Sequence, residues 1–283
     1  MNPIIVDKDF LKPFLLPRDN NSYKGTYGRV LLICGTSSMP GSAILCTGGA
    51  LHSGCGLVTL HSVKRALDAV SVNYPSAMLS EDPGNCFSIV PFFLNKFDVV
   101  VVGPGLGQAP ETLLALKELL SNCKKTKTPM VLDADALNLI SFNKELFDLV
   151  PENSILTPHF GELHRMIEWE ESPKWEKEVF ALSARLKSYI IVKGYHTKVY
   201  APDGKLYENT TGNPGMAKGG SGDVLSGLIG GLLGRGYTSL QAALLGVWIH
   251  GFAGDCLTEE FTAEAYNSSD IIGNLWKGFK ELQ

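Results

Sequence analysis

The chain has 283 residues, of which 45% are hydrophobic and 19% charged, and its formal net charge is −4. This is the balance of a globular protein, and the lack of a basic run argues against a nucleic-acid partner. Residues 1–20 carry charges at Asp7, Lys8 and Asp9, which interrupt the apolar core that a signal peptide needs. The most apolar later stretch, 225–248, is broken by glycines and Arg235. No membrane association is therefore expected, and the cytoplasm is the predicted location.

The cysteines form no CxxC pair and lie among apolar or small residues, which favours buried free thiols of a reducing compartment over a zinc site or a disulfide framework. They are Cys34, Cys46, Cys55, Cys86, Cys123 and Cys256.

Short runs rich in Val, Ile and Leu predict strands that are covered on both faces, because their hydrophobicity is continuous rather than alternating. The runs are 29–35, 56–62, 98–107, 129–138, 154–162 and 189–194. Helical patterns lie between them, for example at 111–121 and 174–188. This alternation is typical of right-handed βαβ crossovers on a mostly parallel sheet.

The pattern changes after residue 194. "TKVYAPDGKLYENT" predicts a hairpin that turns at Pro202-Asp203-Gly204, and three helices are expected after it, at 223–233, 239–257 and 269–281. No repeat or linker is found. The prediction is one α/β domain over 1–283 with three layers, a mostly parallel sheet between two layers of helices, and an N-terminal extension at 1–22.

Ligands of such folds bind beyond the carboxyl ends of the strands. The runs at those ends are rich in Gly, Asp, Asn, His and Lys, and they are 35–38, 103–107, 133–138, 157–162 and 193–197. "GTSSMPGS" at 35–42 lacks the lysine of a Walker A loop, and "GPGLG" at 103–107 matches a dinucleotide fingerprint only in part.

"GGSGD" at 219–223 is more specific, because an apolar helical pattern follows it directly. Glycines let a backbone approach phosphate oxygens, and the N-terminus of a helix binds anions. Asp223 could simply cap that helix. Alternatively, it is a base for phosphoryl transfer, with its charged form stabilised by the helix end so that it stays available near neutral pH.

"GGSGD" at the start of a helix resembles the anion hole and base of the ribokinase-like superfamily. Five further motifs in chain order, the segment 23–60, "VVGPGLG", "LDADALNL", "LTPHFGE" and "IVKGYHT", resemble the ADP/ATP-dependent NAD(P)H-hydrate dehydratase family. The resemblance covers about 23–255. It implies a ribokinase-like fold and a stand-alone dehydratase, since 1–22 is too short for the epimerase domain that two-domain members carry. It also implies ADP or ATP as co-substrate, hydrated NADH or NADPH as substrate, and Mg²⁺. A small-molecule kinase of the same superfamily, acting on a vitamin-precursor alcohol, is the alternative, and a silent nucleotide sensor is a second one.

The resemblance implies a role for each matching position. Asp223 is the expected catalytic base. Expected nucleotide contacts are Lys193, Gly194, Tyr195, His196, Thr197, Gly219, Gly220, Ser221 and Gly222. Expected substrate contacts are Ala43, Gly105, His159 and Asp223. Glu162 is expected to organise Mg²⁺ through water, and Asp133, Asp135 and Asn138 to support the site.

Non-functional explanations stay open for three of these positions: helix packing for Ala43, a structural histidine for His159, and an exposed strand-end lysine for Lys193. A symmetric homo-oligomer is expected, with a tetramer favoured. The preference between ADP and ATP, and between hydrated NADH and hydrated NADPH, stays open.

Overall fold

The computed structural model describes residues 2–167 and 175–283. In this part of the chain a ten-stranded sheet runs in the order β1-β10-β9-β8-β7-β6-β5-β2-β3-β4. Its pairs are parallel except for β10–β9 and β9–β8. The strands are β1 (Ile4–Val6), β2 (Arg29–Ile33), β3 (Leu57–Val63), β4 (Met78–Asp82), β5 (Val99–Val102), β6 (Met130–Leu132), β7 (Ile155–Leu156), β8 (Tyr189–Val192), β9 (Lys198–Tyr200) and β10 (Leu206–Asn209).

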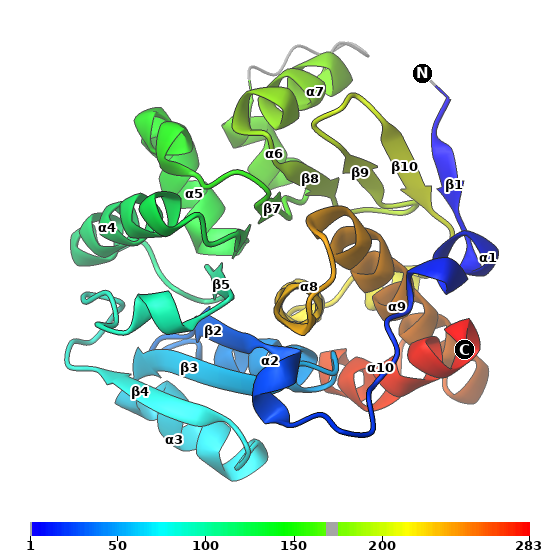
Figure 1. The fold of residues 1–283 in the computed structure, drawn as a ribbon, viewed down its shortest axis with the longest axis horizontal. Helices are drawn as coiled ribbons and strands as arrows, with labels where there is room; N and C mark the ends of the chain where they lie inside the picture. The colour runs from blue at the N-terminus through cyan, green and yellow to red at the C-terminus, as the bar shows by residue number, and fades with distance from the viewer. Residues whose placement is uncertain (1, 168–174) are drawn as a thin grey trace.

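Helices cover both faces of the sheet (Figure 1). One layer holds α2 (Pro40–Leu51), α3 (Lys64–Asn73), α8 (Ser221–Arg235), α9 (Ser239–Glu260) and α10 (Ser268–Leu282). The other holds α4 (Pro110–Thr126), α5 (Ala134–Phe142), α6 (Phe160–Met166) and α7 (Trp175–Leu186). Short helical turns complete the chain: α1 (Lys8–Leu11) and the 3₁₀ turns Lys12–Phe14, Lys24–Tyr27, Leu94–Lys96, Lys144–Leu149 and Pro214–Met216.

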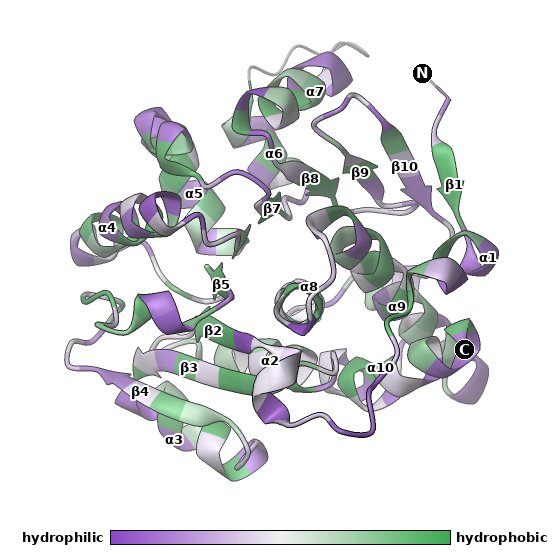
Figure 2. Cartoon of the chain, in the orientation of Figure 1, coloured by the Kyte–Doolittle hydropathy of each residue, from purple (hydrophilic) through white to green (hydrophobic). Residues whose placement is uncertain are grey.

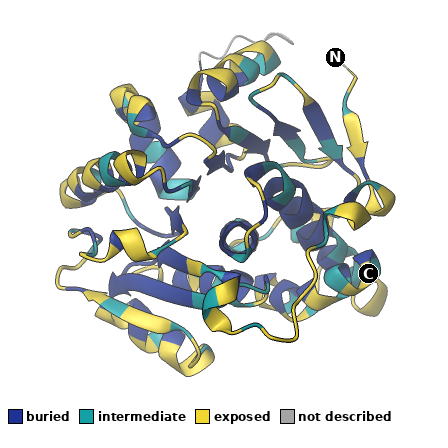
Figure 3. Ribbon diagram, in the orientation of Figure 1, coloured by how far each residue is buried: buried dark blue, intermediate teal, exposed yellow. Residues whose placement is uncertain are grey.

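Alternate residues of each central strand face opposite layers. In β5, Val99 and Val101 join the core beneath α8, whereas Val100 and Val102 join the core beneath α4. Both faces are therefore apolar, as the continuous runs in the sequence predict. Figure 3 shows the central strands, α8 and α9 as buried, and in Figure 2 α9 is mostly hydrophobic while α4 and α7 alternate between polar and apolar residues.

The three-layer prediction is confirmed, and so is the hairpin, whose strands β9 and β10 are antiparallel. Two of the observed strands were not predicted from the sequence. Part of the expected extension, Ile4–Val6, pairs in parallel with β10, and the exposed strand Met78–Asp82 closes the other edge. The apolar stretch 225–248 is divided between α8 and α9. Helix α9 is long and apolar enough to span a membrane, but 72% of its most apolar window is buried inside the protein, as in a core helix.

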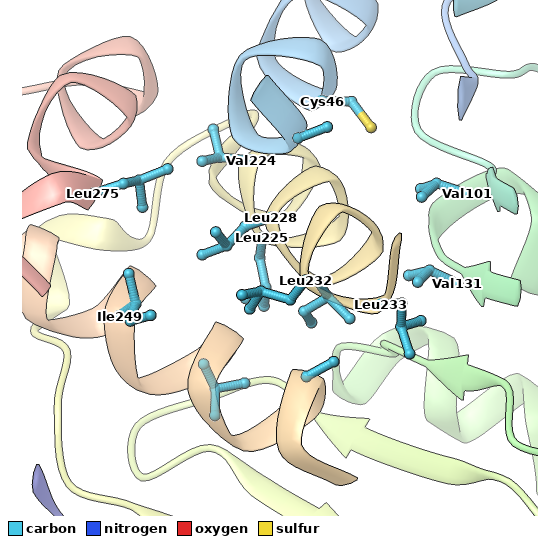
Figure 4. Close-up of a cluster of buried hydrophobic side chains, with 14 of the residues drawn as sticks. Cys46, Val101, Val131, Val224, Leu225, Leu228, Leu232, Leu233, Ile249 and Leu275 are labelled. Atoms are coloured by element: carbon cyan, nitrogen blue, oxygen red, sulfur yellow. The ribbon is translucent and has the colours of Figure 1, made fainter. Parts of the chain in front are cut away.

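Helix α8 lies between α2 and α9 and is viewed almost end on in Figure 1. Its apolar side chains pack among Cys46 of α2, Ile249 of α9 and the central strands (Figure 4). Glycines bring α8 unusually close to α2. A Cβ at Gly227 would lie 1.9 Å from the carbonyl oxygen of Cys46, and one at Gly49 of α2 would lie 2.2 Å from that of Val224. The backbones of these two helices are therefore in contact.

Gly227→Ala should therefore lower the free energy of unfolding by about 2–3 kcal/mol, because the added methyl must push α2 and α8 apart. Gly273→Ala is the matched control, since it makes the same change in α10 where a Cβ meets nothing within 4 Å. Better helix propensity should make that variant more stable by about 0.5–1 kcal/mol. Denaturant unfolding of both variants measures the contrast, and equal effects would refute the close packing.

Candidate active site

A cavity of about 730 Å³ opens at the carboxyl ends of the central strands, beside the first turn of α8. Most of the residues predicted for the site line it. They are His159, Glu162, Lys193, Gly194, Tyr195, His196, Thr197, Ser221, Gly222 and Asp223. Four others do not line it, namely Ala43, Gly105, Gly219 and Gly220. One cavity thus joins the segment after β8 to the "GGSGD" turn.

The turn before α8 is built on glycine. Gly220 has φ +88°, in the left-handed region, and a Cβ there would lie 2.2 Å from the side chain of Leu45. The helix begins at Ser221, two residues earlier than its sequence pattern predicts. Asp223 is therefore the third residue of the helix and is not its N-cap. The amide of Ser221 donates to the carbonyl of Lys218 at 3.3 Å. Because first-turn amides lack partners within a helix, the backbone of Gly222 and Asp223 offers N–H groups to an anion.

Lys193 places an ammonium group beside this turn. Its Nζ donates to Asp133 Oδ1 at 2.7 Å and lies 4.0 Å from Glu162 Oε2, while Asp133 Oδ2 accepts from Ser226 of α8 at 2.6 Å. Burial lowers the pKa of Lys193, but the two carboxylates outweigh burial and raise it above its usual value. A Cβ at Gly222 would lie 3.2 Å from this Nζ. The ammonium of Lys193 and the amides of Gly222 and Asp223 thus border the same cavity, and Lys193 is not an exposed strand-end lysine.

Asp223 has a pKa raised to about 6. Burial is the main cause of the increase, and the charge of Asp133 adds to it. The hydrogen bond with Ser42 and the charge of Lys193 act in the opposite direction and lower the pKa. The sequence prediction that the helix end would stabilise the charged form was wrong in direction, because loss of hydration dominates. A carboxylate with this pKa is mostly ionised at neutral pH and is a stronger base than an exposed one.

His159 and Glu162 form a reciprocal cap at the start of α6. His159 Nδ1 accepts from the amides of Gly161 and Glu162, and Glu162 Oε2 accepts from the amide of His159 at 2.9 Å. His159 thus has a structural role in capping the helix, which the sequence left open, and its side chain also borders the cavity. Among the described residues, no group of three His, Cys, Asp or Glu side chains is placed to hold a metal ion.

The comparisons with known proteins agree with this geometry. The family model for NAD(P)H-hydrate dehydratase matches residues 30–277. The ADP-dependent (S)-NAD(P)H-hydrate dehydratase of Bacillus subtilis is 32% identical over an alignment of 286 positions, gaps included, which covers 99% of this chain and 100% of that relative. This chain belongs to the NAD(P)H-hydrate dehydratase family.

Some relatives in the family are longer. The bifunctional NAD(P)H-hydrate repair enzyme of Thermofilum pendens is 34% identical over an alignment of 281 positions, gaps included, which covers 95% of this chain but 53% of that relative. The chain therefore spans about half the length of the first curated relatives that it matches. Among solved structures, the Bacillus subtilis ADP/ATP-dependent NAD(P)H-hydrate dehydratase co-crystallised with ATP/Mg²⁺ has a TM-score of 0.86 and 28% identity, with 100% of each chain covered.

A ribokinase-like superfamily protein from Enterococcus faecalis also has a TM-score of 0.86, at 28% identity over 98% of this chain and 95% of its own. The fold is therefore ribokinase-like, as the motifs predict. The hydroxyethylthiazole kinase of Pyrococcus horikoshii, at 16% identity and a TM-score of 0.62 over 90% of this chain and 89% of its own, shares the fold alone.

Two of the substrate positions expected from the dehydratase family lie behind the cavity wall. Ala43 is fully buried and packs toward Gly35, where a Cβ would lie 2.7 Å from its own. Gly105, with φ +57°, approaches Ser42, the residue that hydrogen-bonds to Asp223. Gly105 thus contacts Ser42, the partner of Asp223, and Ala43 follows Ser42 in the chain.

Of the three residues expected to support the site, two have other partners. Asp135 accepts from the amide of Gly107 and from the side chain of Gln108, each at 2.8 Å, so it holds the 103–107 turn. Asn138 accepts from Arg165 at 2.8 Å. Only Asp133 reaches the cavity lining.

The far wall of the cavity was not predicted. It is made by the end of β10, the loop that follows and α9, and includes Asn209, Thr211, Asn213, Met216, Lys218, Val247 and His250. The polar loop "NTTGNPGMAK" is a signal that could have been used, whereas His250 sits in an apolar helix and has none. Burial lowers the pKa of His250 to about 4, so it is neutral.

Asp223→Asn should stabilise the protein. Folding raises the pKa of the Asp223 carboxyl from 3.8 to about 6, so the folded state binds this proton more tightly than the unfolded state does. The folded state therefore loses stability as pH rises through this interval and regains it as pH falls. A shift of about two units corresponds to at most about 3 kcal/mol at neutral pH, or a gain in Tm of several degrees. The Tm difference between variant and wild type should be full above pH 6 and vanish below pH 4. A pH-independent difference would contradict the raised pKa.

Proposed function

We propose that the protein repairs hydrated NADH and NADPH by nucleotide-dependent dehydration. The observation that carries this proposal is the half-buried carboxylate of Asp223, which borders the same cavity as the amides of α8 and the ammonium of Lys193. Membership of the family supports the substrate class, because the relatives are named for NAD(P)H hydrate. The geometry supplies the parts that a phosphoryl transfer to an alcohol requires.

The reaction proceeds in two steps. Asp223 accepts the proton of the hydrate hydroxyl as its oxygen attacks the terminal phosphorus of ATP or ADP, and the bond from that phosphorus to the bridging oxygen breaks to release ADP or AMP. The lone pair of the ring nitrogen then expels phosphate as the C–O bond breaks. Loss of the neighbouring proton restores the ring double bond. The phosphorylation matters because phosphate leaves readily, whereas hydroxide does not.

The main chain and Lys193 bind the migrating group. First-turn amides of α8 bear partial positive charge and donate to phosphate oxygens. Lys193 keeps its ammonium charged and gives only one short bond, to Asp133, so it has donors left for phosphate. Tyr195 and Thr197 lie on the segment at the rim of the cavity, where the nucleotide is proposed to bind.

Mg²⁺ is proposed to accompany the nucleotide, as in the Bacillus subtilis crystals grown with ATP/Mg²⁺. The residues fit an ion held mainly by water and phosphate, which is how Mg²⁺ commonly binds. Glu162 borders the cavity, and its two oxygens, although engaged by His159, retain lone pairs for a bound water. The ion would neutralise charge on the phosphate oxygens.

We further propose that the protein works in the cytoplasm as a homo-oligomer, with a tetramer expected. Its six cysteines are all free, which suits a reducing compartment. Exposed apolar side chains support self-association: Met78 and Leu79 lie on the edge strand β4, and Phe92 and Phe93 lie in the loop that follows it. Large exposed apolar residues of this kind often mark protein interfaces.

Incubating the protein with hydrated NADH, Mg²⁺ and ADP or ATP should restore the near-ultraviolet absorbance of NADH and release phosphate. Asp223→Asn should bind nucleotide normally but lower kcat by about 10²–10⁴-fold, since the base is lost. A kinase would instead release a stable phosphorylated product. A sensor would bind nucleotide without turnover. Undiminished turnover by Asp223→Asn would eliminate the base from the mechanism.

The pH dependence follows from the raised pKa. Only ionised Asp223 accepts a proton, so kcat/KM should rise with pH and level off above an inflection at about 6. Initial rates between pH 5 and 8 measure this limb. The residual activity of Asp223→Asn should lack it. A rate that stays constant from pH 5 to 8 would show that this carboxyl titrates near its ordinary pKa in the free enzyme and would contradict the raised value.

A further inference from the structure

The residue before the glycine turn, Lys218, carries its ammonium group in a cage of backbone oxygens. Its Nζ donates to the carbonyls of Ala263 at 2.8 Å and Glu264 at 3.1 Å, and also to the carbonyl of Tyr266. The same Nζ lies 4.6 Å from the centre of the Tyr266 ring. The cage comes from the loop between α9 and α10, more than forty residues further along the chain.

Two further bonds join the end of this loop and the first residue of α10 to the chain at and before the glycine turn. Ser268 donates from its hydroxyl to the carbonyl of Gly219 at 2.8 Å, and the Tyr266 hydroxyl donates to Asn213 at 2.8 Å. Asn213 in turn donates to Asp255 of α9 at 2.9 Å. The turn has a backbone bond of its own, from the amide of Ser221 to the carbonyl of Lys218, and the bonds of Lys218 and Ser268 add support from a distant segment.

We propose that Lys218 is a positioning residue for phosphate binding, a tethered cation whose bonds to the carbonyl cage hold the 219–222 turn in its anion-binding shape. The inference rests on the proposed nucleotide site. An ammonium has three protons, and here all three meet carbonyl oxygens, so Lys218 has none left for phosphate. Lys193 differs, because a single short bond engages it.

The cage suggests its own test. Backbone carbonyl oxygens bind small monovalent cations such as K⁺, which resembles ammonium in size and charge. Lys218→Ala empties the cage and leaves the oxygens without a partner. A free ammonium or potassium ion should then occupy the cage and restore the turn, whereas bulky choline should not.

ADP binding is measured by titration calorimetry in choline chloride, ammonium chloride and potassium chloride of equal ionic strength. Wild type should bind equally in all three. Lys218→Ala should bind about tenfold more weakly in choline, since charge-assisted bonds that shape the turn are lost, and should recover in ammonium or potassium. Lys124→Ala is the control: it also removes an ammonium bonded to a backbone carbonyl, that of Asp148, but on the far layer. It should bind as wild type does.

Unchanged ADP affinity in Lys218→Ala overturns the proposal, and so does a loss that neither cation restores. If Lys218→Ala does not fold, Lys218→Met carries the test. The apolar side chain of this variant keeps the packing on Tyr266 but carries no charge. The variant should therefore bind ADP more weakly than Lys124→Met does, and equal affinity would overturn the proposal. ADP binding needs no turnover, so a wild type that binds ADP without dehydrating NADH hydrate defeats the proposed function and leaves this inference standing.

Discussion

The close approach of α8 to α2 is the constraint on which the site depends. Glycines remove the side chains that would separate the two helices, and the carbonyl of Cys46 stands where a Cβ of Gly227 would be. Apolar side chains on the remaining faces of α8 fill the space toward α9 and the sheet (Figure 4). A helix held this tightly cannot shift along its axis without breaking the fit, so its first turn is fixed at the cavity.

The electrostatics of the site follow from that placement. The amides of the first turn and the ammonium of Lys193 gather positive charge, while Asp133 and Glu162 hold the ammonium in position. Asp133 also accepts from Ser226, on the next turn of α8, so the cation is tied to the helix as well as to the sheet. An arriving phosphate therefore meets groups that are already oriented, which reduces the reorganisation that transfer requires.

Much of the fold and of the near wall was predictable from the sequence, because strands buried on both faces leave continuous apolar runs and their ends carry the polar residues. Other features leave no local signal. The strand Ile4–Val6 owes its structure to a partner two hundred residues away. Ala134 and His196 have φ of +47° and +56° at the cavity, values that tertiary contacts impose on residues that disfavour them. The carbonyl cage of Lys218 likewise depends on a distant loop.

The pKa of Asp223 shows why sequence reasoning fails at such a point. A helix N-terminus lowers the pKa of a carboxyl that water still surrounds, and the sequence shows only the helix. In the folded protein the carboxyl loses most of its hydration, and burial outweighs the help of Ser42 and Lys193. The ionised carboxyl of Asp223 is thus less stable in the folded protein than in water, and the packing of α8 keeps it at this position. The same loss of water makes the carboxylate basic enough to take a proton from an alcohol.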